Sequence, residues 1–81
     1  MLQKYKWEFN SVNVLVFSTS VKTATDVHSL EPLINSLAGN GNWNFALDDC
    51  DHILRIVSDK VEPMNAILLL QAQGFECKEL E

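Results

Sequence analysis

Residues Asn42-Trp43-Asn44-Phe45-Ala46-Leu47-Asp48-Asp49-Cys50-Asp51-His52-Ile53-Leu54-Arg55-Ile56-Val57 predict a β-hairpin. Trp43, Phe45 and Leu47 alternate with polar or small residues, and this period of two is typical of a strand with one buried face. The segment Asp48-Asp49-Cys50-Asp51 predicts a tight turn, and an apolar second strand is expected to begin at His52. The two strands are therefore expected to pair in an antiparallel hairpin.

A strand and a helix are predicted before this hairpin. Residues 12–17 are β-branched and apolar on both faces, which favours a well-buried central strand. A helix follows and stops at Gly39, and its apolar side chains recur at spacings of three and four: Val27, Leu30, Leu33, Ile34 and Leu37. Pro32 lies inside this pattern, where proline removes a backbone hydrogen bond. Either the helix is kinked there or its regular part begins near Ser29.

A second helix and a last strand are predicted after the hairpin. Ser58 or Asp59 can cap that helix, and Pro63 suits its first turn. Its expected core stripe, up to a stop at Gly74, consists of Met64, Ile67 and Leu68, widened by Leu70. Residues 75–80 then alternate as a strand.

This order, β-α-β-β-α-β, predicts an α+β ferredoxin-like sandwich. We expect a four-stranded antiparallel sheet with two helices on one face, formed by residues 11–81 as one domain. The loop at residues 18–25, the turn at residues 48–51 and the turn at Gly74 should meet at one end of the sheet, the first place to seek a small-ligand site. The other sheet face should be uncovered and free to dock a second copy or a partner.

Residues 1–10 form an extension outside these six elements. Tyr5, Trp7 and Phe9 alternate there with polar residues. This pattern indicates either an extra edge strand or an interaction arm, because aromatic side chains are favoured anchors at protein interfaces.

Composition narrows the classes of function. The 81 residues are 47% hydrophobic and 21% charged, which is typical of a small globular domain. The net charge of −5 disfavours nucleic acid as a partner. The longest apolar run, residues 66–70, is too short for membrane insertion, and the first residues contain no signal-peptide stretch, so the expected location is cytoplasmic. Cys50 and Cys77 are expected to be reduced thiols.

The segment Ala72-Gln73-Gly74-Phe75-Glu76-Cys77 is similar to the pattern Ala-x-Gly-[Tyr/Phe]-x-Ala. With this ending, residues 12–80 resemble the heavy-metal-associated domain family, to which small copper chaperones belong and whose domains usually end in that pattern. Alignment of the first helix places Val21 at the family's metal-loop methionine, and Thr23 and Asp26 at its two metal-binding cysteines. A threonine and a carboxylate do not replace soft ligands for Cu(I). Thr23 and Asp26 instead form a capping-box spacing, which predicts a helix start closed by hydrogen bonds.

A second candidate metal site lies in the hairpin turn. Asp49, Cys50, Asp51 and His52 are potential ligands for zinc or copper, although acidic residues also make good turns. The sequence contains no readable Ser/His/Asp or Cys/His arrangement and no phosphate-binding glycine loop, so we expect the protein not to be an enzyme.

These features predict a non-catalytic binding module without a cofactor, which acts through an unknown protein partner or as a homodimer. The alternative is a metal-binding protein that uses the hairpin turn. A small-molecule sensor is a third interpretation, based on analogy of fold alone.

Overall fold

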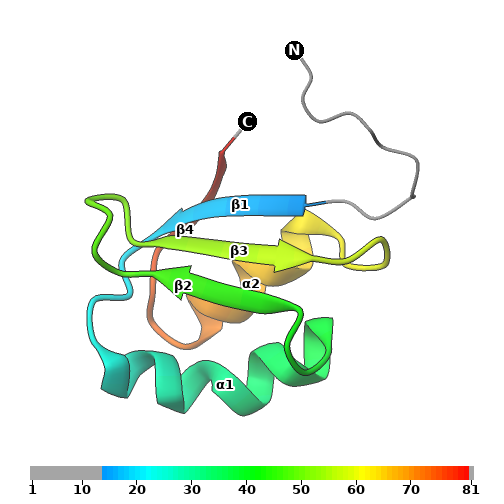
Figure 1. The fold of residues 1–81 in the computed structure, drawn as a ribbon, viewed down its shortest axis with the longest axis horizontal. Helices are drawn as coiled ribbons and strands as arrows, with labels where there is room; N and C mark the ends of the chain where they lie inside the picture. The colour runs from blue at the N-terminus through cyan, green and yellow to red at the C-terminus, as the bar shows by residue number, and fades with distance from the viewer. Residues whose placement is uncertain (1–13, 81) are drawn as a thin grey trace.

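The predicted element order is confirmed by a computed structural model, which describes residues 14–80. Figure 1 shows the six elements: β1 (Val14–Thr19), α1 (Ala24–Ala38), β2 (Trp43–Ala46), β3 (Ile53–Val57), α2 (Pro63–Ala72) and β4 (Cys77–Leu80). The extension at residues 1–10, with the predicted extra strand or interaction arm that contains Tyr5, Trp7 and Phe9, lies outside the described residues.

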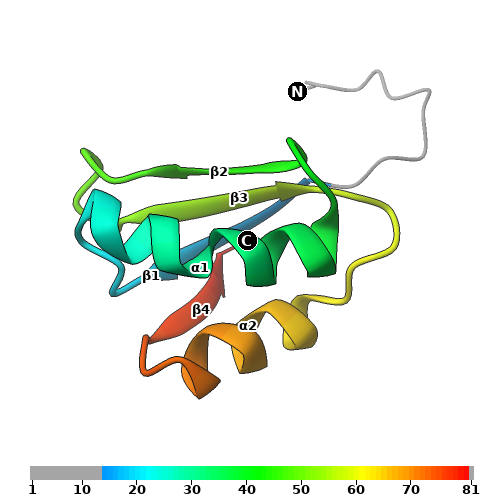
Figure 2. The same ribbon diagram turned by 90° about the horizontal axis from the view of Figure 1, so that it is seen from below.

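The four strands form one antiparallel sheet in the order β2-β3-β1-β4. Both helices lie on the same side of this sheet, with α1 against β2 and α2 against β4 (Figure 2). The fold is therefore α+β with a ferredoxin-like arrangement, as the sequence predicts.

The core fills the space between the sheet and the two helices. Phe17 of β1 lies opposite Leu54 of β3 in the register, and both side chains are fully buried. Leu30 and Ile34 of α1 and Leu70 of α2 close this layer from the helix side. Burial of such side chains is the main favourable term that holds a small domain together.

The opposite face of the sheet is not covered by either helix, and we call it the open sheet face. Strand alternation and register assign to it Val14, Val16, Ser18, Asn44, Ala46, Ile53, Arg55, Val57, Lys78 and Leu80. Val14 is 56% exposed and Val57 is 39% exposed. The sheet thus has one closed side and one mostly apolar side that the described elements leave in solvent.

Pro32 lies inside α1, and the helix begins well before it. Thr23 is the N-cap and the first helical residue is Ala24, so the alternative that the regular helix begins near Ser29 is wrong. The cap at Thr23 sets the start of the helix, and α1 accommodates the proline in its interior.

The second helix differs from the prediction in two respects. Its N-cap is Glu62, with Pro63 at the first helical position, and the Ser58 hydroxyl instead accepts a hydrogen bond from the Lys60 N–H at 3.0 Å. Neither Ser58 nor Asp59 caps the helix, because Pro63 fixes the start four or five residues later.

The predicted core stripe of α2 is also partly wrong. The buried residues are Ala66 and Leu70, whereas Met64 is 58% exposed and Leu68 is 53% exposed. Since α2 is apolar on almost every side, the spacing of its apolar residues does not show which side faces the core.

Strand ends differ from the prediction by one or two residues. The hairpin strands end at Ala46 and begin again at Ile53, so Leu47 and His52 belong to the connection. His52 has a φ of 47°, in the left-handed region, which interrupts a regular strand at that residue. The last strand begins at Cys77, two residues after Phe75.

Candidate functional site

Three loops meet at one end of the sheet, as the topology predicts. The Thr19 N–H donates to the Asp51 carbonyl at 3.1 Å, which joins the end of β1 to the hairpin turn. On the other side, the Ser20 N–H donates to the Glu76 carbonyl at 3.1 Å, and the Glu76 N–H donates to Ser20 Oγ at 2.8 Å. The end of β1 and the start of the loop that follows it therefore lie between the hairpin turn and the segment before β4, and they hold both by hydrogen bonds.

The hydroxyl of Thr19 is a buried link in this arrangement. It donates to the His52 carbonyl at 2.6 Å and accepts from the Val21 N–H at 3.2 Å. Because both roles of the hydroxyl are used, Thr19 fixes the loop geometry and has no free donor to offer a ligand.

Val21, Thr23 and Asp26 are the three residues that the sequence resemblance aligns with a metal loop, and each of them contributes to packing or to the start of α1. Val21 is fully buried in the core. Thr23 has an extended backbone, and its hydroxyl accepts a hydrogen bond from the Asp26 N–H at 3.0 Å. Asp26 lies in the first turn of α1, where a carboxylate complements the helix dipole. This donor set does not fit soft Cu(I), and its hydroxyl is already engaged in the cap.

Replacement of Thr23 by alanine is expected to lower the free energy of unfolding by about 1 kcal/mol, because one N–H of the first turn loses its side-chain acceptor. Thr23→Ser keeps an acceptor oxygen and is the matched control, with an expected loss well below that of alanine. Denaturant titration of the two variants provides the measurement. Equal stability of Thr23→Ala and the unsubstituted protein would contradict a capping role.

The hairpin turn brings together three of its four predicted ligands. Ligand atoms of Asp49, Cys50 and Asp51 lie within 4.8 Å of one another, and all three residues are exposed. An Asx turn orders this segment, since the Asp51 N–H donates to Asp49 Oδ1 at 2.9 Å. The turn therefore presents two carboxylates and one thiol to solvent as potential metal ligands.

His52 does not belong to this group of ligand atoms. Its Nδ1 is buried and, among the described residues, has no hydrogen-bond partner. Its backbone is used in turn contacts, with its N–H donating to the Asp49 carbonyl at 2.9 Å and its carbonyl accepting from Thr19. The structure thus separates the imidazole from the three residues that precede it.

The two cysteines differ in environment. Cys50 is exposed, whereas Cys77 is 8% exposed and burial raises the pKa of its thiol to about 11. The thiol of Cys77 is therefore neutral and inert near neutral pH, and it serves as a small core residue.

Alkylation at about pH 8 is expected to modify Cys50 and to leave Cys77 unmodified in the folded protein, because the thiolate is the reacting species. Mass spectrometry of the iodoacetamide-treated protein shows which cysteine is modified, and treatment in denaturant controls for accessibility.

The contribution of Cys77 to stability is expected to depend on pH. Because burial raises the pKa of its thiol in the folded state, the stabilisation that the buried thiol contributes is complete below pH 9.0 and is lost as the pH rises through about 11. The stability difference between the unsubstituted protein and Cys77→Ala should therefore shrink over that interval, and a constant difference would contradict it.

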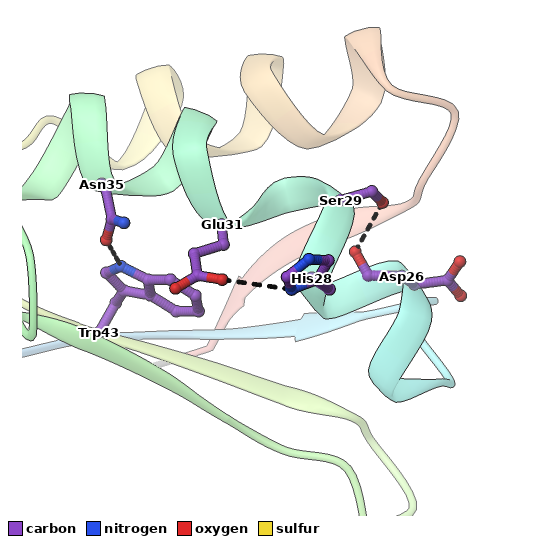
Figure 3. A network of polar contacts seen from close by, with 6 residues as sticks. All are labelled: Asp26, His28, Ser29, Glu31, Asn35 and Trp43. Carbon is purple, nitrogen blue, oxygen red and sulfur yellow. Dashed lines mark hydrogen bonds and ion pairs between the residues drawn. The ribbon is translucent and has the colours of Figure 1, made fainter.

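A polar network on α1 connects the helix to β2 (Figure 3). The Trp43 indole N–H donates to Asn35 Oδ1 at 2.7 Å, which fixes the edge strand on the helix. His28 Nδ1 lies 3.5 Å from Glu31 Oε1, but the histidine side chain is 87% exposed and such a surface pair contributes little. The Trp43–Asn35 bond thus joins the two elements, and neither contact places a nucleophile beside a base.

No family model matches the chain, and neither the curated proteins nor the solved structures contain a significant match to it. Neither helix in residues 14–80 has the length and apolar character that a membrane crossing requires.

Sequence reasoning missed two features that bear on function. The hydroxyl link from Thr19 to His52 joins residues 33 positions apart, and no local pattern indicates it. The exposed pair on α2, Met64 and Leu68, is visible in the sequence only through the absence of charged residues from that helix.

Proposed function

We propose that this domain is a non-catalytic binding module of the cytoplasm that associates with another protein through its open sheet face. It is similar to heavy-metal-associated domains, but its metal-loop positions serve as a helix cap. The observation that carries the proposal is the exposure of Val14 and Val57 on a sheet face that the described elements leave uncovered. An extended apolar surface of this kind gains free energy when a partner removes it from water.

The charges of the open sheet face indicate the kind of partner. Arg55 lies in the middle of the sheet on β3, and Lys78 lies on the edge strand β4. Within residues 14–80 these are the charged side chains of the face, and both are basic, although the whole chain carries a net charge of −5. A partner surface that is apolar and bears a carboxylate near Arg55 is complementary to this pattern, and the same charges disfavour stacking of two identical faces.

The Thr23 cap supports the absence of metal-carrier chemistry. Loss of both thiolates removes the soft ligands that Cu(I) requires, and the remaining hydroxyl is engaged in a hydrogen bond to the helix backbone. The fold is retained because a helix start needs only hydrogen-bond acceptors.

A photo-crosslinking amino acid introduced at Val57 tests the proposal in cells that express the protein. Ser36, which is exposed on α1, is the matched control position on the opposite side of the molecule. We expect a discrete crosslinked partner from Val57 and none from Ser36. The purified partner should then bind the unsubstituted domain, and it should bind the Arg55→Glu variant at least ten-fold more weakly. In that variant two carboxylates face each other at a desolvated interface, and their repulsion costs more than about 1.4 kcal/mol. Equal crosslinking from both positions would refute the proposal.

A second candidate function is metal binding at the hairpin turn, favoured by the 4.8 Å grouping of Asp49, Cys50 and Asp51. One thiolate and two carboxylates are suitable ligands for Zn²⁺, with water completing the four-coordinate shell. Titration of reduced, isotope-labelled protein with Zn²⁺ and then Cu(I) should give saturable amide shifts confined to residues 48–52, and Cys50→Ser should abolish them. Unchanged spectra in a large molar excess of both metals would end this candidate.

A further inference from the structure

A tight turn at residues 39–42 joins the end of α1 to β2 (Figure 1). The Asn42 N–H donates to the Gly39 carbonyl at 3.2 Å, which closes the turn. The two residues between them are Asn40 and Gly41. Gly41 has a φ of 79°, in the left-handed region that favours glycine. The fold thus places an asparagine directly before a glycine in the middle of a turn.

Hydrogen bonds hold both ends of this turn in place. At its start, the Gly39 N–H donates to the Asn35 carbonyl at 2.8 Å. At its end, Asn42 Nδ2 donates to the Ala38 carbonyl at 2.9 Å, and the Asn42 carbonyl accepts from the Val57 N–H at 2.7 Å. The turn is therefore anchored to α1 on one side and to β3 on the other.

The two middle residues of the turn are free by comparison. Asn40 is exposed, and within residues 14–80 neither its side-chain amide nor the Gly41 N–H has a hydrogen-bond partner. A Cβ atom placed on Gly41 would meet no atom within 4 Å, so the space around this residue is open. A free side-chain amide and an unhindered backbone nitrogen are therefore neighbours in solvent.

These two groups can react with each other. The Gly41 nitrogen loses its proton to a base in solvent and attacks Cγ of Asn40, and the side-chain nitrogen leaves as ammonia. The product is a five-membered succinimide, whose closure is favoured because nucleophile and electrophile belong to adjacent residues. Water then breaks either the bond from Cγ to nitrogen, which gives aspartate, or the bond from the main-chain carbonyl to nitrogen, which gives isoaspartate. The sequence of steps consumes water, releases ammonia and needs no oxidant or cofactor.

The other asparagines of residues 14–80 lack one of these conditions. The side chains of Asn35 and Asn42 are held in hydrogen bonds to β2 and to the end of α1. Asn44 and Asn65 are exposed, but each lies in a regular element and precedes a residue with a side chain, which crowds the attacking nitrogen. The conditions for ring closure therefore coincide at Asn40 among the described asparagines.

We propose that Asn40 is a modification site that converts spontaneously to aspartate and isoaspartate in the folded protein. Each conversion adds a negative charge to a chain whose net charge is already −5. Asn40 and Gly41 line a surface hollow together with Glu31, Asn35 and Trp43, so the new carboxylate lies on the same hollow as an existing one. Isoaspartate also inserts a methylene into the main chain of a turn that is anchored at both ends. This chemistry involves neither the open sheet face nor the hairpin turn.

Peptide mass spectrometry of the full chain, incubated in neutral and in mildly alkaline buffer, tests the proposal. Asn40 should convert roughly ten-fold faster than Asn44, which corresponds to a barrier lower by about 1.4 kcal/mol. Isoaspartate should appear together with aspartate, because direct hydrolysis of the side chain gives aspartate alone. The rate should rise with pH, since the deprotonated Gly41 nitrogen is the attacking species.

Asn40→Gln is the matched control, because it keeps an exposed side-chain amide but would have to close a larger ring. This variant should fold normally and show no conversion at position 40. A folded-state rate at Asn40 no greater than that at Asn44, or conversion that occurs only in denaturant, would overturn the proposal.

A stability measurement tests the expected strain in the turn. Ion-exchange chromatography separates the more acidic products from the unmodified protein, and Asn40→Asp carries the same added charge without the extra methylene. The isoaspartate form should unfold at a lower denaturant concentration than Asn40→Asp. Equal midpoints would contradict the expected strain at this turn.

Discussion

Replacement of Phe17 by alanine is expected to lower the free energy of unfolding by about 3–5 kcal/mol. The side chain is fully buried on the central strand β1, where it faces both helices and lies opposite Leu54. Its removal loses the transfer free energy of the ring and leaves a cavity that a closely packed core refills only in part. Since domains of this size have total stabilities near the low end of about 5–15 kcal/mol, a large fraction of the variant should be unfolded on mild heating.

The matched control for Phe17 is Val57→Ala on the open sheet face. Val57 is 39% exposed, and its truncation should cost less than about 1 kcal/mol because little area is withdrawn from water. Denaturant and thermal unfolding of both variants, measured at low and high protein concentration, provide the comparison. A loss for Phe17→Ala no greater than that for Val57→Ala would contradict the assignment of the two sheet faces.

The elements that the sequence predicts correctly are those with a strong contrast between two faces. Trp43 and Phe45 alternate with polar or small residues, so their strand has one possible buried side. Leu30 and Ile34 recur at helical spacing in a helix that carries polar residues on its other side, and they are indeed fully buried. Such contrast specifies both the type of element and its orientation.

Helix α2 shows where this contrast fails. Its mean composition is so apolar that several stripes fit the same spacing, and the prediction included Met64 and Leu68 although the structure buries Ala66 and Leu70. Small alanine gives a weak hydrophobic signal, yet it permits the close approach of a helix to a sheet. The same ambiguity leaves Met64 and Leu68 exposed where the spacing predicts a core stripe.

The candidate metal site was predictable in part for a similar reason. Asp49, Cys50 and Asp51 are neighbours in sequence, so a turn brings their ligand atoms together without help from the rest of the fold. The position of His52 depends on a long-range hydrogen bond from Thr19 to its carbonyl and on its left-handed backbone, neither of which is encoded locally. Sequence proximity therefore overestimates the ligand set by one residue.

Pro32 gives the second large expected effect, in the opposite direction. It occupies the middle of the 15-residue helix α1, where it donates no N–H to the His28 carbonyl and its ring crowds that carbonyl. Pro32→Ala restores the donor, and proline in a helix interior is less favourable than alanine by about 3 kcal/mol. The side chain is exposed, so no core contact is lost in the exchange.

The free energy of unfolding of Pro32→Ala is therefore expected to rise by up to about 3 kcal/mol, less the modest entropy that proline removes from the unfolded chain. Denaturant titration measures the gain, and hydrogen exchange of the new amide at position 32 shows whether it bonds to His28. Ser36→Ala on the same helix is the matched control, with an expected gain of a few tenths of a kcal/mol from propensity alone. A neutral or destabilising result for Pro32→Ala would mean that α1 has relaxed around the proline and that its ring stabilises the helix surface. If Pro32→Ala raises the free energy of unfolding, Phe17→Ala can be introduced into that stabilised background. Residue 17 lies on a strand far from residue 32 in sequence, so the double variant should remain folded enough for the destabilisation by Phe17→Ala to be measured.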